Sequence, residues 1–212
     1  MRVLLVTVLA LALVLPFPAG AFDWSSVASK VEPSLVTVEH SGHPVCSGFV
    51  IDAKKLLVLS ANHCWTNIEF TVDGSKVDAI WYDYELDLMV LRVGGIVGKP
   101  ALKLRTKPML DGMEVMALGH AYGSGSNYKR AGHIAGASVI PPPLFQHFLS
   151  SSGRDPLRPY MALDFDVIGG MSGGAIVDTG GKVVSLVQMG DGMTAISIRQ
   201  ADLIAAVGKY FN

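Results

Sequence analysis

The sequence predicts a mostly β protein that ends in a single helix. Short apolar or alternating segments recur between Gly, Pro, Asn and Asp residues, which is the pattern of strands joined by turns. Many short strands at regular spacing are typical of barrels and sandwiches. Only residues 199–211 show a clear helical period, with Leu203 and Val207 on one apolar face. We therefore expect an all-β fold with a C-terminal α-helix packed on its outside.

Two series of candidate strands follow each other along the chain. The first covers residues 35–40, 47–51, 56–60, 68–72, 77–82 and 88–93. The second follows a loop-like break and covers residues 101–104, 113–118, 134–140, 160–165, 175–178, 183–189 and 194–198. Residues 122–158 are rich in Gly, Ser and Pro, so we expect an exposed loop system there, with one helical turn near 144–149. The two series predict an N-terminal barrel in residues 22–98 and a C-terminal barrel with the helix in residues 99–212.

The N-terminal segment predicts export. Arg2 gives a positive start, residues 3–15 are apolar, and Ala19-Gly20-Ala21 forms a small-residue cleavage site. The apolar run is shorter than the roughly 20 residues that a membrane-spanning helix needs. We expect residues 1–21 to be a signal peptide and the protein to be secreted or periplasmic, without membrane contact once the leader is removed. An uncleaved membrane anchor is the alternative.

Composition and charge exclude several classes of protein. The chain has 212 residues, of which 50% are hydrophobic and 17% are charged, so it is neither disordered nor a coiled coil. The net charge is −1 and no long basic run occurs, so we expect no nucleic-acid partner. The histidines are scattered and the cysteines lack metal-binding spacing, so we expect no metal and no cofactor.

Three motifs carry chemistry. They are residues 59–64 (LSANHC), 85–91 (ELDLMVL) and 169–175 (GGMSGGA). The first closes an apolar strand with His63, the second places Asp87 at the mouth of a buried strand, and the third surrounds Ser172 with glycines. Each has an ordinary interpretation on its own: a structural histidine, a strand-edge acid and a glycine-rich turn. Together, in the order His, Asp, Ser, they match one known order of a catalytic triad.

A nucleophilic serine also needs donors for the oxyanion of its intermediate. Backbone N–H groups serve best, because they are fixed in place before the reaction. The N–H groups of Gly170 and Ser172 are the candidates, since glycine can adopt the φ angle that turns its N–H inward.

The two cysteines, Cys46 and Cys64, complete the set of candidate residues. Export would place them in an oxidising compartment, where a pair of cysteines most often forms one disulfide. Such a bridge would pin the loop that carries His63 to the strand beginning at Ser47. Two separate buried thiols are the alternative.

These motifs resemble those of trypsin-like serine peptidases. Residues 46–51 (CSGFVI) and 60–64 (SANHC) resemble the family's CxGxxI and TAAHC patterns, ELDLMVL resembles its acid motif, and GMSGG at 170–174 resembles its serine motif. The segments 117–123 and 193–198 are similar to the HtrA/DegP-like branch, here expected without a PDZ domain. The resemblance implies two perpendicular six-stranded β-barrels with the active site between them.

The resemblance also implies a mechanism. The protein would be a secreted serine endopeptidase in which Ser172 attacks the scissile carbonyl and forms an acyl-enzyme. His63 would transfer the proton, Asp87 would orient the imidazole, and the N–H groups of Gly170 and Ser172 would bind the oxyanion. The partner would be a protein or peptide substrate, paired as an added strand with residues 185–190.

Specificity rests on weaker signals. Asp166 lies six residues before Ser172, where trypsins place the acid that selects Arg or Lys, although the HtrA-like register aligns Asp164 with a structural acid instead. Either carboxylate has an ordinary interpretation as a solvated or hydrogen-bonded loop residue. The resemblance implies a pocket wall formed by Gln188, Met189 and Gly190.

Two alternative functions follow from the same residues. Met171 replaces the Asn or Asp that usually precedes the serine, which leaves open a pseudo-peptidase that binds a peptide or protein without cutting it. An esterase would share the Gly-x-Ser-x-Gly pattern at Ser172, but that family places its histidine last, and no histidine follows Ser172.

Overall fold

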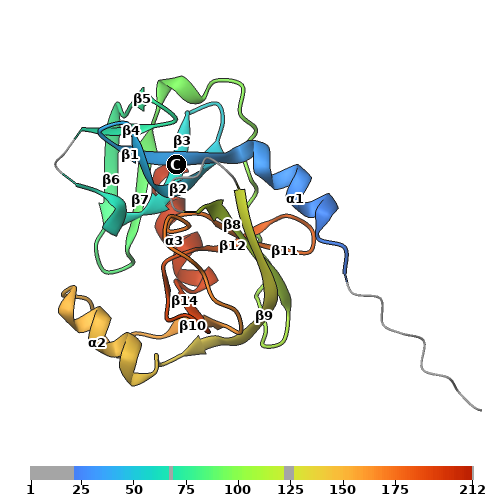
Figure 1. The fold of residues 1–212 in the computed structure, drawn as a ribbon. Coiled ribbons are helices and arrows are strands. Elements are labelled where there is room, and N and C mark those ends of the chain that lie inside the picture. The colour runs from blue at the N-terminus through green and yellow to red at the C-terminus, as the bar shows by residue number, and fades with distance from the viewer. Residues whose placement is uncertain (1–21, 67–68, 122–126, 212) are drawn as a thin grey trace, which may run out of the picture.

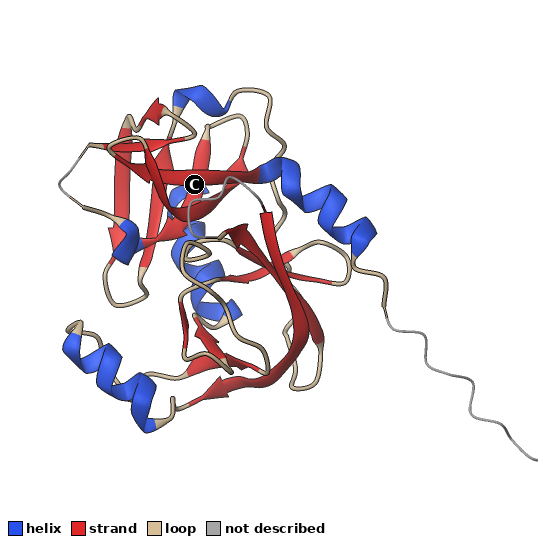
Figure 2. Cartoon of the chain, viewed as in Figure 1, coloured by secondary structure: helices blue, strands red, loops and turns tan. Residues whose placement is uncertain are grey.

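The computed structural model describes residues 22–66, 69–121 and 127–211. The predicted signal peptide, residues 1–21, and the start of the predicted strand at residue 68 lie outside the described residues. Strands dominate the fold and are joined by a few short helices (Figure 2). The helices are α1 (Ser25–Val31), α2 (Pro143–Ser151) and α3 (Gln200–Phe211), with 3-10 turns η1 (Glu32–Ser34), η2 (Asn62–Cys64) and η3 (Gly94–Ile96). Among the described helices, each is too short or too polar to cross a membrane.

The first sheet is built from the N-terminal half of the chain. Its strands are β1 (Leu35–His40), β2 (His43–Asp52), β3 (Leu57–Ala61), β4 (Phe70–Val72), β5 (Ser75–Lys76), β6 (Ala79–Asp83) and β7 (Leu88–Arg92). They pair antiparallel in the order β5-β4-β1-β2-β3-β7-β6. β3 lies near the middle of the sheet and is buried along its whole length, which explains its continuous apolar run.

The second sheet uses the C-terminal half. Its strands are β8 (Glu114–His120), β9 (Asn127–Val139), β10 (Tyr160–Leu163), β11 (Ala175–Asp178), β12 (Val183–Leu186), β13 (Met189–Gly190) and β14 (Ala195–Ser197). Their order is β12-β11-β8-β9-β10-β14-β13, again with antiparallel pairs. Figure 1 shows this sheet beside the first, with α3 running along the region where they meet.

The predicted all-β class and the C-terminal helix are confirmed, but the strand count is wrong. Each sheet has seven strands in the described part of the chain, rather than six. The difference comes from short edge strands, because β5 and β13 contain only two residues each and so show no readable period. The predicted strand at 101–104 is also wrong. That segment is extended and contributes one isolated bridge, between Leu104 and Val183.

The region that we expected to be an exposed loop system is more ordered than its composition indicates. β9 begins at Asn127 and continues to Val139, and α2 is a full helix rather than a single turn. Its Phe145 and Leu149 are buried against Tyr160 and Ile196 of the second sheet. Tertiary packing therefore stabilises a segment whose Gly and Pro content favours loops.

The C-terminal helix holds the two halves together. Leu203, Ala206 and Val207 are fully or almost fully buried, in a cluster that contains residues of both sheets. Tyr210 reaches the first sheet, with its ring centroid 5.9 Å from that of Trp81. The apolar face predicted from the sequence is thus the face that packs.

The start of α3 is fixed by one buried glutamine. Gln200 accepts a hydrogen bond from the N–H of Met109 at 2.9 Å. Its amide nitrogen donates to the carbonyls of Arg105 at 2.6 Å and Lys107 at 3.0 Å. The segment that leads into the second sheet is therefore tied to the helix.

We predict that Gln200→Ala lowers the free energy of unfolding by about 1–3 kcal/mol, because it leaves buried backbone groups without partners. Urea unfolding followed by tryptophan fluorescence measures the change. The matched control is Lys209→Ala at an exposed site on the same helix, for which we expect less than about 0.5 kcal/mol. Equal stabilities of the two variants would contradict the prediction.

Candidate active site

His63 and Asp87 form a doubly bonded pair. η2 follows β3 directly and carries His63, while Asp87 immediately precedes β7, the neighbour of β3 in the sheet. The Nδ1 of His63 lies 2.7 Å from Oδ2 of Asp87, and the backbone N–H of His63 donates to Oδ1 at 2.8 Å. The side chain of Asp87 is 3% exposed, whereas that of His63 is 40% exposed. The pair therefore presents a fixed imidazole to solvent.

The backbone at Asp87 is strained. Its φ angle is +50°, a left-handed conformation that few non-glycine residues adopt. Hydrogen bonds hold it there: its N–H donates to the carbonyl of Tyr84 at 3.2 Å, and its carbonyl accepts from the N–H of Asn62 at 3.1 Å. Such outliers persist only where the surrounding structure fixes them, and they cluster at functional sites.

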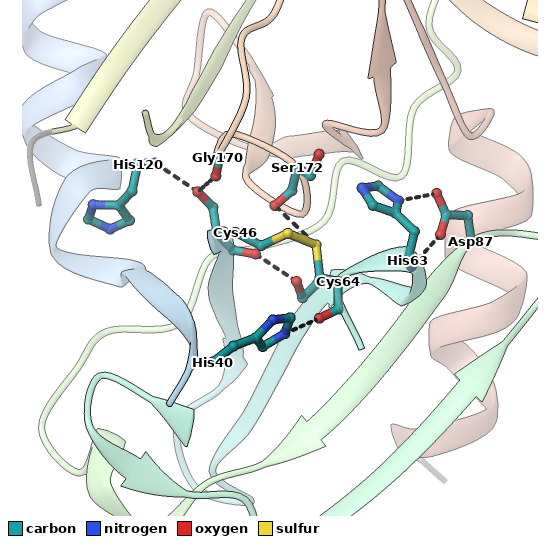
Figure 3. Close-up of a disulfide and its surroundings, with 10 residues drawn as sticks. His40, Cys46, His63, Cys64, Asp87, His120, Gly170 and Ser172 are labelled. Atoms are coloured by element: carbon teal, nitrogen blue, oxygen red, sulfur yellow. Dashed lines mark hydrogen bonds and ion pairs between the residues drawn. A yellow bond between two sulfur atoms is a disulfide. The ribbon is translucent and has the colours of Figure 1, made fainter. Parts of the chain in front are cut away.

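Ser172 lies in the turn that joins β10 to β11, and it reaches the first sheet. Its carbonyl accepts a hydrogen bond from the N–H of Ser47 at 2.8 Å and lies 3.8 Å from the Sγ of Cys64. A ring nitrogen of His63 lies within 4.8 Å of that sulfur. Figure 3 shows the imidazole of His63 between the carboxylate of Asp87 and Ser172. The structure thus brings the three predicted residues into one region.

Ser47 is the centre of the contact between the two sheets. It is fully buried on β2, and its hydroxyl donates to the carbonyl of Gly170 at 2.8 Å. The same oxygen accepts from the N–H of His120, at the end of β8, at 2.7 Å. Together with the bond to Ser172, one serine on the first sheet engages three residues of the C-terminal half.

Gly173 permits this close approach. A Cβ atom there would lie 2.2 Å from the carbonyl oxygen of Ser47 and 2.3 Å from Oγ of Ser60, far inside contact distance. Its φ angle of +81° also favours glycine. The glycine after the serine is therefore required by packing as well as by the turn.

The backbone around Gly170, one of the predicted oxyanion donors, forms a tight turn. The N–H of Met171 donates to the carbonyl of Ile168 at 3.1 Å, and Gly170 has a φ angle of +89°, as in the third position of a type II turn. Within the described residues, the N–H groups of Gly170 and Ser172 donate to no protein acceptor. Met171 is fully buried in the core of the second sheet, so its side chain replaces a polar residue without opening the turn.

The predicted disulfide between Cys46 and Cys64 is present. It connects β2, next to Ser47, with the turn that carries His63, and so ties the imidazole to the strand that binds the serine turn. These cysteines and His63 are close enough together to suggest a metal site, but both sulfurs are already bonded to each other. A disulfide sulfur is no thiolate, and thiolates are the form of cysteine that binds metals.

The predicted specificity residues divide into two groups. Asp166 lies beside the end of the second sheet, where its Oδ1 accepts the N–H of Gly192 at 3.1 Å, and a Cβ at Gly190 would lie 2.5 Å from the same oxygen. Gln188, expected to line the pocket, instead donates to the carbonyls of Leu86 at 2.6 Å and Asp87 at 3.2 Å. Its side chain is buried, so it supports the acid-bearing turn rather than a pocket wall.

The side chains of Met189 and Asp164 also contact neighbouring residues. Met189 is half-buried and packs against the cluster that seats α2. Asp164 accepts the backbone N–H of His133 at 2.6 Å and faces its Nδ1 at 3.0 Å. Of the two candidate acids, Asp164 thus takes a structural position, and Asp166 is the one beside Gly190.

The match to a family model decides the family. A model of the trypsin-like peptidase domain matches residues 46–186, more than half of the chain. The chain belongs to the trypsin-like peptidase family. The resemblance predicted from the sequence is confirmed, and all three motifs lie in the matched region. A search of the curated proteins finds no match.

Several solved structures have a similar fold. The Rv3671c protease from M. tuberculosis in its active form gives a TM-score of 0.70 at 23% identity, over 86% of this chain and 83% of that chain. An inactive form of Rv3671c protease gives 0.70 at 23% identity, over 88% and 93%. The serine endoprotease from Yersinia pestis gives 0.69 at 19% identity, over 88% and 66%. At these identities the likeness concerns the fold.

Two residues beside these motifs, Ser47 and Arg154, escaped the sequence interpretation. Ser47 lies next to Cys46 in a motif that we used only for its cysteine. Arg154 forms an ion pair with Asp87, with Nη1 2.9 Å from Oδ2, yet it lies in a region expected to be loop. The ring nitrogens of His120 are buried without partners in the described structure, and burial lowers the pKa of this imidazole.

We predict that Ser47→Ala lowers the free energy of unfolding by about 1–3 kcal/mol, because the carbonyl of Gly170 and the N–H of His120 both lose their partner. Urea unfolding measures this. Ser60→Ala is the matched control, since it removes one buried hydrogen bond to Ser47 and none to the serine turn. Of the two variants, only Ser47→Ala should also slow the reaction of Ser172 with a fluorophosphonate probe. The prediction is refuted if Ser47→Ala is as stable and as reactive as the wild type.

Proposed function

We propose that this peptidase is an exported serine endopeptidase that cleaves peptide bonds through an acyl-enzyme, with His63, Asp87 and Ser172 as its triad. The observation that carries the proposal is the buried carboxylate of Asp87 bonded to Nδ1 of His63, beside Ser172. This bond directs the remaining ring nitrogen, Nε2, to act as the base.

The reaction then follows from the geometry. Ser172 attacks the scissile carbonyl while Nε2 of His63 accepts its proton, and the carboxylate of Asp87 stabilises the imidazolium that forms. The unpaired N–H groups of Gly170 and Ser172 stabilise the oxyanion. The imidazolium next protonates the leaving amine, and the amide C–N bond breaks to leave an acyl-enzyme. Water, activated by His63, hydrolyses this ester and frees Ser172.

A peptide substrate has a place to bind beside these residues. β13 is the last strand of the second sheet, so one side of its backbone is free for pairing with an extended peptide. A pocket of about 410 Å³ is lined by His63, with Trp65 and Tyr82 among its other walls, and it offers room for a substrate side chain.

Export belongs to the same proposal. The apolar leader in residues 1–21 has the layout of a signal peptide. A disulfide next to the proposed base persists only in an oxidising compartment, such as the periplasm or the extracellular space.

We expect a fluorophosphonate probe to label the wild-type protein at Ser172 and Ser172→Ala to abolish labelling. His63→Ala should slow labelling by at least about 10³-fold, since the hydroxyl loses its base. Ser29→Ala, at an exposed serine on α1, is the control and should react like the wild type. Intact-protein mass spectrometry locates the adduct. An unreactive, folded wild type would instead favour a non-catalytic peptide-binding module.

We further predict a preference for Arg over Leu and Val at the residue before the cleaved bond. Asp166 would bind the guanidinium, because Gly192 occupies one of its oxygens and leaves the other available. Asp166→Asn should reduce the Arg-to-Leu ratio of kcat/KM by about 10- to 100-fold, the value of a hydrogen bond to a charged group. Asp164→Asn is the control. Equal cleavage of Arg, Leu and Val peptides by the wild type would exclude this role.

A further inference from the structure

The carboxylate of Asp87 is shared between His63 and an arginine from the other half of the molecule. Nη1 of Arg154 lies 2.9 Å from Oδ2 of Asp87, the same oxygen that faces Nδ1 of His63 at 2.7 Å. The side chains of Arg154 and Asp87 are 7% and 3% exposed. We infer that Arg154 is a positioning residue, which holds the carboxylate of Asp87 in the orientation that His63 requires. The inference rests on the proposed triad.

The end of α2 aims Arg154 at the acid. The N–H of Gly153 donates to the carbonyl of Ser150 at 3.0 Å, and that of Arg154 donates to the carbonyl of Leu149 at 2.9 Å. With Gly153 at a φ angle of +73°, these two bonds form a Schellman motif, which ends the helix and reverses the chain. Arg154 is therefore placed by the backbone and not by a flexible loop.

A second contact fixes the same segment to the first sheet. The hydroxyl of Tyr84, three residues before Asp87, donates to the carbonyl of Ser152. Within the segment, Nε of Arg154 donates to Oγ of Ser152 at 3.0 Å, so the guanidinium plane is held at two of its nitrogens. The end of α2 and the acid-bearing turn thus behave as one unit.

The arrangement leaves the carboxylate a single orientation. Oδ1 accepts from the backbone N–H of His63, and Oδ2 lies between the imidazole and the guanidinium. Gln188, a buried side chain between β12 and β13 that also reaches this turn, bonds to backbone carbonyls and not to the carboxylate. Arg154 also supplies the opposite charge that a buried, ionised carboxylate needs. Arginine suits this role because its donors form a rigid fork.

Arg154 also lines the pocket beside His63, so direct contact with substrate is the competing role. A small fluorophosphonate probe with short alkyl groups reacts with Ser172 and carries no peptide side chain that could fill this pocket. A substrate-binding arginine would therefore change KM for peptides and leave the labelling rate unchanged. A positioning arginine would slow labelling itself.

The first test compares labelling rates. We expect Arg154→Met to slow labelling by roughly 10- to 100-fold, the range that misplacement of a catalytic group by about 1 Å produces. Arg154→Lys, which keeps the charge, should recover part of the rate, and Tyr84→Phe should cause a smaller loss in the same direction. Arg158→Met is the control, because Arg158 lies in the same segment but faces Asp202 at 3.7 Å. Wild-type or faster labelling of folded Arg154→Met would overturn the inference.

A double-mutant cycle then asks whether Arg154 acts through Asp87. In an Asp87→Asn background, Arg154→Met should change the residual labelling rate by less than about twofold, because the interaction that it removes is already lost. The same fold-loss in both backgrounds would show that Arg154 acts independently and would exclude a positioning role. Circular dichroism confirms that each variant is folded.

Proton NMR provides a readout that needs no catalysis. The Nδ1–H of His63 bonded to Asp87 should give a resolved low-field resonance in the wild type. Arg154→Met should shift or broaden it, and Arg158→Met should leave it in place. An unchanged resonance in Arg154→Met would overturn the inference even in an active enzyme. Conversely, the resonance could be present in the wild type and altered in Arg154→Met while the wild type is not labelled. That outcome would refute the proposed function and leave the positioning role standing.

Discussion

The contact between Ser47 on β2 and the turn that carries Ser172 is the constraint on which the site depends. The imidazole and the carboxylate belong to the first sheet, and the hydroxyl belongs to the second. Three hydrogen bonds at Ser47 and the missing side chain of Gly173 bring these parts within atomic contact. Interiors are too closely packed to absorb a shift of an ångström at such a place. The mutual orientation of the sheets therefore sets the geometry of the proposed triad.

The acid is held from a second direction by the end of α2. Asp87 combines a left-handed backbone with an almost fully buried charge, and both are unfavourable in isolation. The hydrogen bonds around the turn stabilise the backbone, and Arg154 and His63 together satisfy the carboxylate. Because α2 itself packs on the second sheet, the position of the Asp87 carboxylate also depends on how the two halves are placed.

The sequence predicted the disulfide and singled out the three residues of the proposed triad because each is marked by a local pattern. His63 closes an apolar strand next to a cysteine, and Ser172 lies between glycines whose conformations the turn requires. Patterns failed where tertiary packing overrides composition. Residues 127–139 are polar and glycine-containing, yet they form the longest strand of the described chain, because both neighbours in the sheet supply its hydrogen bonds. Strands of two residues, such as β5, are too short to show any period.

The sequence by itself determined the class of the fold, which follows from periodicity, and the candidates for a triad and an oxyanion site, which follow from motif order and from glycine's conformational freedom. Only the tertiary structure decided what holds them. More than a hundred positions separate Gln188 from Leu86, and Ser47 from Gly170. The local sequence around one partner does not indicate the other. Side chains such as Arg154 acquire their partners from the packing of whole elements. A local sequence pattern does not show which distant residues this packing brings together.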